Sequence, residues 1–440
     1  MLKRFFVTGT VAVLLLAAGV RDGFATPDLP QNRPDIHLGV TSCAGSTCHG
    51  AAAAWDKSTV LQNEYVTWSQ KDSHSKAYTV LMNDASKRIA ANLGLPNAHE
   101  ADVCLDCHAD NVAPAARGRV FQISDGIGCE ACHGGAERWL GLHVAGIAGH
   151  AENVAAGMYP TEDPVKRAEL CLSCHFGDET KFVTHRIMGA GHPRMSFELD
   201  TFTAIQPAHF VVDDDYRKRK QVANGIQTWA IGQAIALERR IDALLDPKRG
   251  MDGIFPELVL FDCQACHHSL TEPRWQARPS TGLGPGVVRF DDSNLLMLRV
   301  LVSSLDPDQG ARLAEQTKQL HKASTESVDA FHAAAKELKQ TTGDLVSMFS
   351  GHKFGKADIS KLLAGLITEA KNAEFSDYAG AEQATMAIGS VLSTATQMGM
   401  TELADAAKDP LDKAFAALAK YDAWDYAGFR SAIEAIPVPN

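Results

Sequence analysis

The chain has 440 residues and a formal net charge of −11, with 45% hydrophobic and 22% charged residues. This length allows two or three domains, and the apolar content excludes a disordered or collagen-like chain. The 42 basic residues are outnumbered by 53 acidic ones, which argues against a nucleic-acid-binding protein because such proteins usually carry a basic surface. We therefore expect a folded protein without a nucleic-acid partner.

The N-terminal residues have the pattern of an export signal. Lys3 and Arg4 precede an apolar run over 5–20, and the small residues Gly23 and Ala25 follow it. This pattern predicts a Sec-type signal peptide over 1–25, cleaved after Ala25. An uncleaved membrane anchor is the alternative, but the run is shorter than the roughly 20 residues that span a bilayer. We expect a periplasmic protein that is soluble after cleavage.

The ten cysteines form five pairs, and histidine follows the second member of every pair. Seventeen of 440 residues are histidine, so five such coincidences have a chance probability on the order of 10⁻⁷, whereas C-x-x-C-H is the attachment signature of c-type haem. The pairs with their histidines, numbered below as the first to fifth motif, are Cys43/Cys48–His49, Cys104/Cys107–His108, Cys129/Cys132–His133, Cys171/Cys174–His175 and Cys263/Cys266–His267.

The chemistry of haem attachment explains this spacing. Two thiols bind the macrocycle covalently, and the adjacent imidazole binds the iron as proximal ligand. Structural zinc and disulfides are the alternatives, but tetrahedral zinc sites do not require a histidine after each cysteine pair. The first motif differs because four residues separate Cys43 from Cys48. A disulfide with an incidental His49 stays open there, so we expect five haems c and four at minimum.

Two segments resemble the tetrahaem cytochrome c-554 family. They are 68–77 (WSQKDSHSKA) and 128–143 (GCEACHGGAERWLGLH), within a similarity over roughly 40–180 that includes the spacing of the second, third and fourth motifs. The resemblance implies an irregular, mainly α, haem-packed fold for this part. The widened first motif, the fifth motif and the C-terminal extension depart from the family pattern.

The resemblance also implies distal iron ligands. It suggests His143 as the distal ligand of the first haem and His74 as that of the third. In the family the second haem lacks a distal ligand, which would leave His108 as the sole protein ligand of a five-coordinate iron.

The segment after the fourth motif offers two further histidines between glycines. We expect His185 and His192 to be the distal ligands of the fourth and fifth haems, because glycine allows a planar cofactor to approach the backbone closely. Arg194 can pair with a haem propionate. The alternatives that we weigh lower are His37, His99, His150 and His209 as ligands, Met188 and Met195 as ligands, and a contact of His268 with a propionate or a neighbouring haem.

The remaining chain indicates helices. Residues 213–220 (DDDYRKRK) predict a helix start that continues through Ile241, with either a solvated first turn or a docking patch for a redox partner. The cysteine-free residues 286–440 predict an antiparallel helical bundle, in which we expect His321, His332 and His352 to be surface or core residues. The expected helices cover 293–305, 307–340, 357–373, 379–398 and 401–420, with breaks at Gly343, Gly351 and Pro410.

These patterns predict a mainly α protein with a multihaem cytochrome domain over 26–285 and a helical bundle over 286–440. We expect it to transfer electrons between redox partners, either a partner protein or a membrane-bound carrier. One alternative is a haem enzyme that acts on a small nitrogen or sulfur oxo-compound at a five-coordinate iron on His108. Another is a docking subunit that joins a larger complex through its C-terminal helices.

Overall fold

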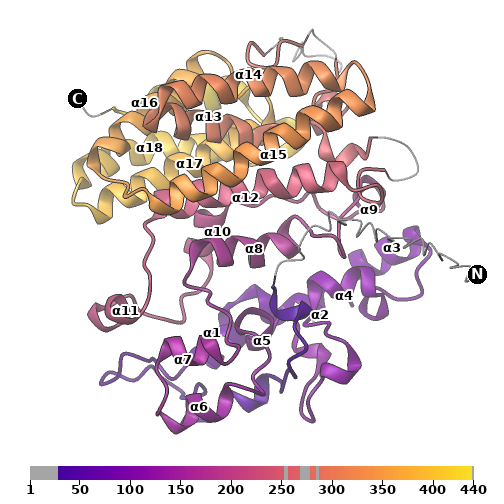
Figure 1. The fold of residues 1–440 in the computed structure, drawn as a ribbon, viewed down its shortest axis with the longest axis vertical. Coiled ribbons are helices and arrows are strands. Elements are labelled where there is room, and N and C mark those ends of the chain that lie inside the picture. Colours follow the sequence, from indigo (N-terminus) through magenta and orange to yellow (C-terminus); the bar gives the residue numbers. More distant parts are fainter. Residues whose placement is uncertain (1–27, 252–255, 268–277, 284–286, 439–440) are drawn as a thin grey trace, which may run out of the picture.

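The computed structural model describes residues 28–251, 256–267, 278–283 and 287–438. This part of the chain is built from helices, and its only extended pairings are three isolated bridges. The fold is therefore mainly α, as the sequence predicts. Figure 1 shows two stacked parts, with short helices below and a bundle of longer helices above. The expected signal peptide lies outside the described residues.

The lower part contains short helices joined by long irregular segments. Its own cluster of buried apolar residues is small and consists mainly of Leu81, Leu105 and three alanines. Short helices with so little apolar core cannot support one another, so the lower part needs something else to pack around. Its helices are α1 (Glu64–Lys71), α2 (Ala77–Val80), α3 (Asp84–Leu93), α4 (Asp102–His108), α5 (Cys129–His133), α6 (Leu140–Ala145), α7 (His150–Ala155), α8 (Pro164–His175), α9 (His185–Gly189), α10 (Leu199–Ile205) and α11 (Asp214–Arg219).

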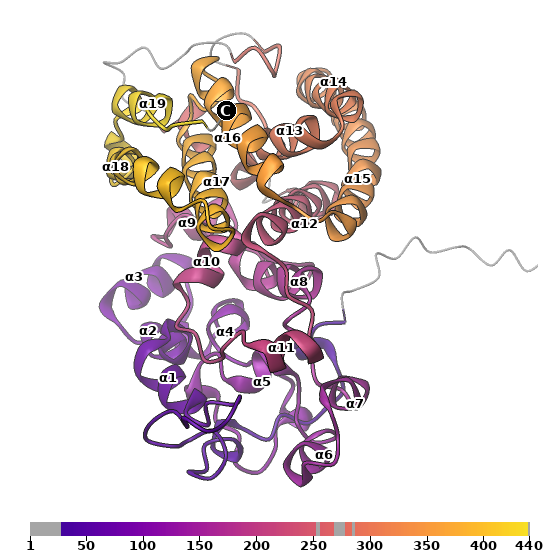
Figure 2. The same ribbon diagram turned by 90° about the vertical axis from the view of Figure 1, so that its left-hand side faces the viewer.

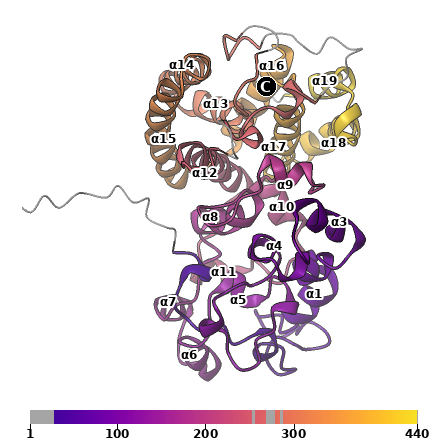
Figure 3. The same ribbon diagram turned by 90° about the vertical axis from the view of Figure 1, so that its right-hand side faces the viewer.

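The upper part is a bundle around one continuous apolar core, which Figures 2 and 3 show from the two sides. Its first helix is α12, which packs against α8 and α10 below and against bundle helices above. The bundle therefore begins before the fifth motif rather than at residue 286. Its helices are α12 (Gly225–Leu245), α13 (Ser293–Leu305), α14 (Pro307–Ser324), α15 (Val328–Gly351), α16 (Lys356–Lys371), α17 (Tyr378–Gln397), α18 (Thr401–Ala417) and α19 (Tyr426–Glu434).

Helix boundaries differ from the prediction where capping and packing override the sequence pattern. The helix expected over 307–340 is two helices, because the Ser327 hydroxyl accepts a hydrogen bond from the Ala330 amide and starts α15. In the same way, Asn224 caps α12 and separates it from α11. Gly343 and Pro410 lie inside α15 and α18 and break neither helix.

Among the described helices, none is both long enough and apolar enough to cross a membrane.

Candidate metal centres

Helix geometry places the reactive side chains of three motifs on one face. The helices α4, α5 and α8 each end at a motif histidine, namely His108, His133 and His175. The two cysteines and the histidine of each motif stand at positions i, i+3 and i+4, which neighbour one another on a helix surface. The fifth motif begins in a short 3-10 helix (η8, Cys263–Ala265), and the widened first motif follows another (η2, Val40–Ser42).

Every motif histidine faces one histidine from a distant part of the chain. The distance between ring centres is nearly the same in all five pairs, although the rings are stacked in one pair and tilted or edge-on in the others. The pairs are His49–His143 at 5.9 Å, His108–His192 at 6.5 Å, His133–His209 at 6.3 Å, His175–His74 at 6.1 Å and His267–His185 at 6.2 Å.

These distances are those expected of two imidazoles on opposite sides of one metal ion. A metal–imidazole bond is about 2 Å, and the ring centre lies about 1 Å beyond the nitrogen, so two trans ligands have ring centres about 6 Å apart. Direct van der Waals contact between stacked rings would bring them closer. Each of the five pairs is therefore spaced so that its two imidazoles could hold one metal ion between them.

Hydrogen bonds at the other ring nitrogen orient the imidazoles. The Nδ1 atom of His49 lies 2.9 Å from Glu64 Oε2, and that of His74 lies 2.8 Å from Asp72 Oδ1. The Nδ1 atom of His108 lies 3.0 Å from the carbonyl oxygen of Ala77. Such partners fix the tautomer and leave Nε2 available to a metal, as is usual for metal-binding histidines.

Burial keeps several of these imidazoles neutral. Loss of solvation lowers the pKa of His133 to about 3 and that of His175 to about 4. The same cause lowers the pKa of His108, His143 and His209. The carboxylates of Glu64 and Asp72 instead raise the pKa of His49 and His74. A neutral imidazole is the form that binds a metal, so the buried environment favours ligation.

The pairing differs from the expected one at the second, third, fourth and fifth motifs. His143 lies opposite the first motif, as the resemblance suggests. His74 lies opposite the fourth motif rather than the third, whose partner is His209. His192 faces His108, so the second motif has a second imidazole within reach where the resemblance implies an open position. His185 faces the fifth motif.

The other described histidines have different neighbours. His37 is buried with its Nδ1 2.7 Å from Asp110 Oδ2, and His150 Nε2 is 2.5 Å from Glu162 Oε1. His99 packs edge-on against Tyr78, and His321 in the bundle is 3.1 Å from Asp292 Oδ2. His268 lies outside the described residues.

The motifs also contact one another. All ten cysteines lie within the described residues. The side chain of Cys43 lies beside that of Cys129, which brings the first and third motifs together. The side chain of Cys107 lies beside that of Cys174, which brings the second motif to the fourth.

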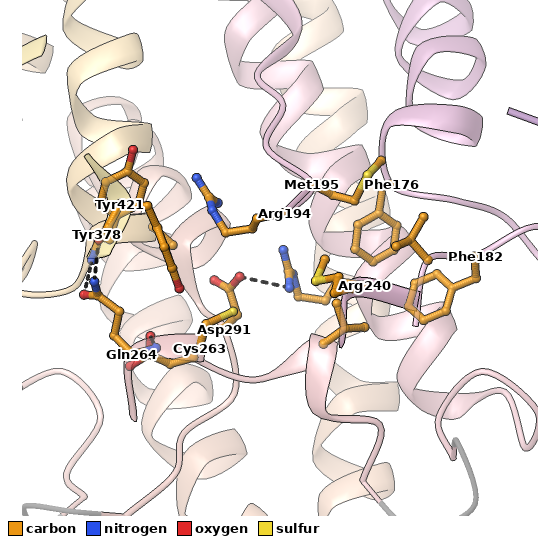
Figure 4. Close-up of a pocket in the computed structure, with 15 residues that line it drawn as sticks. Phe176, Phe182, Arg194, Met195, Arg240, Cys263, Gln264, Asp291, Tyr378 and Tyr421 are labelled. Atoms are coloured by element: carbon orange, nitrogen blue, oxygen red, sulfur yellow. Dashed lines mark hydrogen bonds and ion pairs between the residues drawn. The ribbon is translucent and has the colours of Figure 1, made fainter. Parts of the chain in front are cut away.

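A small cavity of about 50 Å³ lies beside the fifth motif. Both parts of the chain line it: Phe176, Phe182, Arg194 and Met195 come from the lower part, and Arg240, Tyr378 and Tyr421 come from the bundle (Figure 4). Met188 also lines it.

Two arginines in this cavity are held in place. The guanidinium of Arg194 pairs with Glu382 at 2.6 Å and lies over the rings of Tyr378 and Tyr421. Arg240 pairs with Asp291 at 3.0 Å (Figure 4). Apolar side chains and two cations beside Cys263 are residue types that would contact the flat apolar macrocycle and the anionic propionates of a haem.

Cys266 departs from the other predicted attachment residues. It is exposed, whereas the other nine cysteines are half-buried. Cys263 lines the cavity beside the fifth motif, and Cys266 is not among the lining residues. Cys266 is the C-terminal cap of η8, and the backbone still turns as a helix there, because the His267 amide donates to the Cys263 carbonyl at 2.8 Å. The structure therefore does not place Cys266 at the cavity, and its role as the second anchor of the fifth haem stays a prediction from the motif.

A cluster of three or more His, Cys, Asp or Glu side chains suited to a metal ion does not occur among the described residues.

Comparison with known proteins supports a cytochrome assignment for part of the chain. Residues 42–134 match the family model described as cytochrome c554 and c-prime. This segment contains the first, second and third motifs and His74. The comparisons find no curated protein and no solved structure that matches the chain.

Proposed function

We propose that this protein, whose residues 42–134 match the cytochrome c554 and c-prime family model, is an exported c-type cytochrome that transfers electrons and binds five haems c. When bound, each haem supplies a one-electron iron couple. The chain supplies two thiols that anchor it and two imidazoles that ligate its iron. The observation that carries the proposal is that all five motif histidines face a second histidine at 5.9–6.5 Å.

The contacts between motifs support electron transfer. The first motif touches the third through Cys43 and Cys129, and the second touches the fourth through Cys107 and Cys174. The side chain of Cys132 lies near those of Cys171 and Cys174, so the third and fourth motifs are close as well. Redox centres that lie this close together can exchange electrons with one another. Such a protein does not require a substrate-binding site.

The arrangement disfavours the enzyme alternative. That alternative needs an iron with a free coordination position, and the resemblance would place it at His108. His192 stands 6.5 Å from His108, and its Nδ1 is held 2.8 Å from the carbonyl oxygen of Pro193. The remaining nitrogen is thus available to fill the position that a substrate would need.

The bundle takes part in the proposed fifth site. Tyr378, Ala379 and Tyr421 of the bundle and its connections line the cavity beside Cys263. This favours a bundle that encloses the fifth haem over one that serves only to dock into a larger complex.

We propose a periplasmic location and a redox partner, either a protein or a membrane-bound carrier. The signal-peptide pattern over 1–25 supports export. Helix α11 exposes Arg217 and Lys218 at the side of the lower part, which suits an acidic partner. Fractionation of cells that express the full chain tests the location: the mature protein is expected in the periplasmic fraction, and retention in the cytoplasm would contradict export.

Intact mass of the mature protein tests the haem number. The mass is expected to exceed that of the polypeptide cleaved after Ala25 by five haems. A mass with four haems would remove the widened first motif, Cys43/Cys48, from the proposal. The matched control is a Cys43→Ser, Cys48→Ser variant, which is expected to carry one haem fewer than the unmodified protein.

A further inference from the structure

A buried lysine lies where the second and fourth motifs meet. The side chain of Lys181 is almost enclosed, and the residue is only 8% exposed. Its Nζ donates to the carbonyl oxygen of Asp106, inside the second motif, at 2.9 Å. The same atom lies 3.1 Å from Cys174 Sγ, an attachment residue of the fourth motif. One ammonium group therefore touches both motifs.

The turn after the fourth motif positions the side chain of Lys181 between the second and fourth motifs. Gly177 has a φ of +124°, and a Cβ there would lie 2.5 Å from the Lys181 carbonyl oxygen, so the tight turn requires glycine. The Asp178 amide donates to that carbonyl at 2.8 Å. The Asp178 carboxylate then accepts from the amides of Thr180 and Lys181 at 2.8 and 3.2 Å. This turn therefore brings Lys181 back beside the fourth motif.

The charge of Lys181 is only partly compensated. The atoms that contact its ammonium, a carbonyl oxygen and a sulfur, are uncharged in a protein whose cysteines carry haem. The carboxylate of Asp178, 1% exposed, interacts electrostatically with the lysine but forms no ion pair with it, and its Oδ2 has no hydrogen-bond partner. A cation in such a low-dielectric place acts strongly on neighbouring charges.

We propose that Lys181 is a positioning residue that raises the reduction potentials of the haems at the second and fourth motifs. Gain of an electron makes an iron site more negative, so a fixed cation beside its attachment edge stabilises the reduced form. Asp178 acts in the opposite direction. The inference rests on the proposed function, because it needs haems at both motifs.

Potentiometric titration of the mature protein and of Lys181→Met tests this role. Loss of the charge is expected to lower two of the five potentials, with a change of at least tenfold in each reduction equilibrium, which is about 59 mV for a one-electron couple. Lys181→Arg keeps the charge and is expected to change them by less than tenfold. Lys408→Met, at an exposed lysine of the bundle, is expected to change none.

Asp178→Asn gives a second and opposite readout. It keeps an acceptor oxygen for the turn and removes the negative charge, so the same two potentials are expected to rise. If Lys181→Met does not acquire its haems, the reduction potentials of Asp178→Asn and Lys181→Arg test the role of Lys181 instead. Unchanged potentials in Lys181→Met or Asp178→Asn, or an equal shift of all five, would refute the role of Lys181 and leave the proposed function intact. An intact mass without haem at the second and fourth motifs would refute both proposals.

Discussion

Replacement of His192 by alanine should open one iron site and leave the others closed. The structure places His192 opposite His108 at a ring-centre distance of 6.5 Å. Alanine has no metal-binding group, and Nε2 of His108 then remains as the only axial ligand of the second motif. The other four histidine pairs are separate and should keep both imidazoles.

The expected size of the effect follows from the count of pairs. One site of five changes, so about one fifth of the haem should become high-spin, and the reduced variant should bind one equivalent of carbon monoxide per chain. Optical titration with carbon monoxide measures both quantities. His99→Ala is the matched control, because His99 packs against Tyr78 rather than a motif histidine, and it should bind none.

Two outcomes would contradict this reasoning. The first is a His192→Ala protein that stays fully low-spin and binds no carbon monoxide. The second is an unmodified protein that already binds one equivalent, which would mean that the second site is open despite His192 and would favour the enzyme alternative.

Two further variants test what holds the fold together. Arg278→Met removes a buried guanidinium that pairs with Asp292 and, at 3.0 Å, with Asp377. Asp292 keeps His321 and Asp377 keeps Arg289 as partners, so the free energy of unfolding should fall by about 3 kcal/mol, the lower end of the range for a broken buried ion pair. Denaturant unfolding of the haem-loaded protein with a loss under 1 kcal/mol would speak against this. Burial raises the pKa of Glu198 from 4.5 to about 7, so the folded state keeps a proton that the unfolded state releases, and the unmodified protein should lose stability as pH rises from 4.5 to 7. Glu198→Gln should not show this loss. Its free energy of unfolding, relative to that of the unmodified protein, should therefore rise by up to about 3 kcal/mol between pH 4 and pH 8. A difference in free energy of unfolding that does not change with pH would disprove the assignment.

The attachment motifs could be predicted from sequence because their chemistry is local. Two cysteines and a histidine at fixed spacing form one face of a helix end, as α4, α5 and α8 show. The fifth motif is the exception, because its Cys266 is exposed and does not line the cavity beside Cys263.

The distal histidines could not be assigned in the same way, because each comes from a segment far away in the chain. Nothing in the residues around His209 distinguishes it from His150, and only the fold brings it to His133.

Helices with a uniform apolar pattern were also predictable. The helix expected over 293–305 is α13, with the same bounds. The start of the bundle was not predictable, because α12 is separated from α13 by the fifth motif and joins the bundle core through packing. Pro410 shows the same limit, since α18 continues through it where local propensity predicts an end.

The most direct test of five histidine-paired irons is a spin count of the unmodified, fully oxidised protein by electron paramagnetic resonance. Each chain should contain five low-spin ferric centres, because every motif histidine has a second imidazole opposite it. A high-spin centre in the intact protein, or fewer than five ferric centres per chain, would contradict the account.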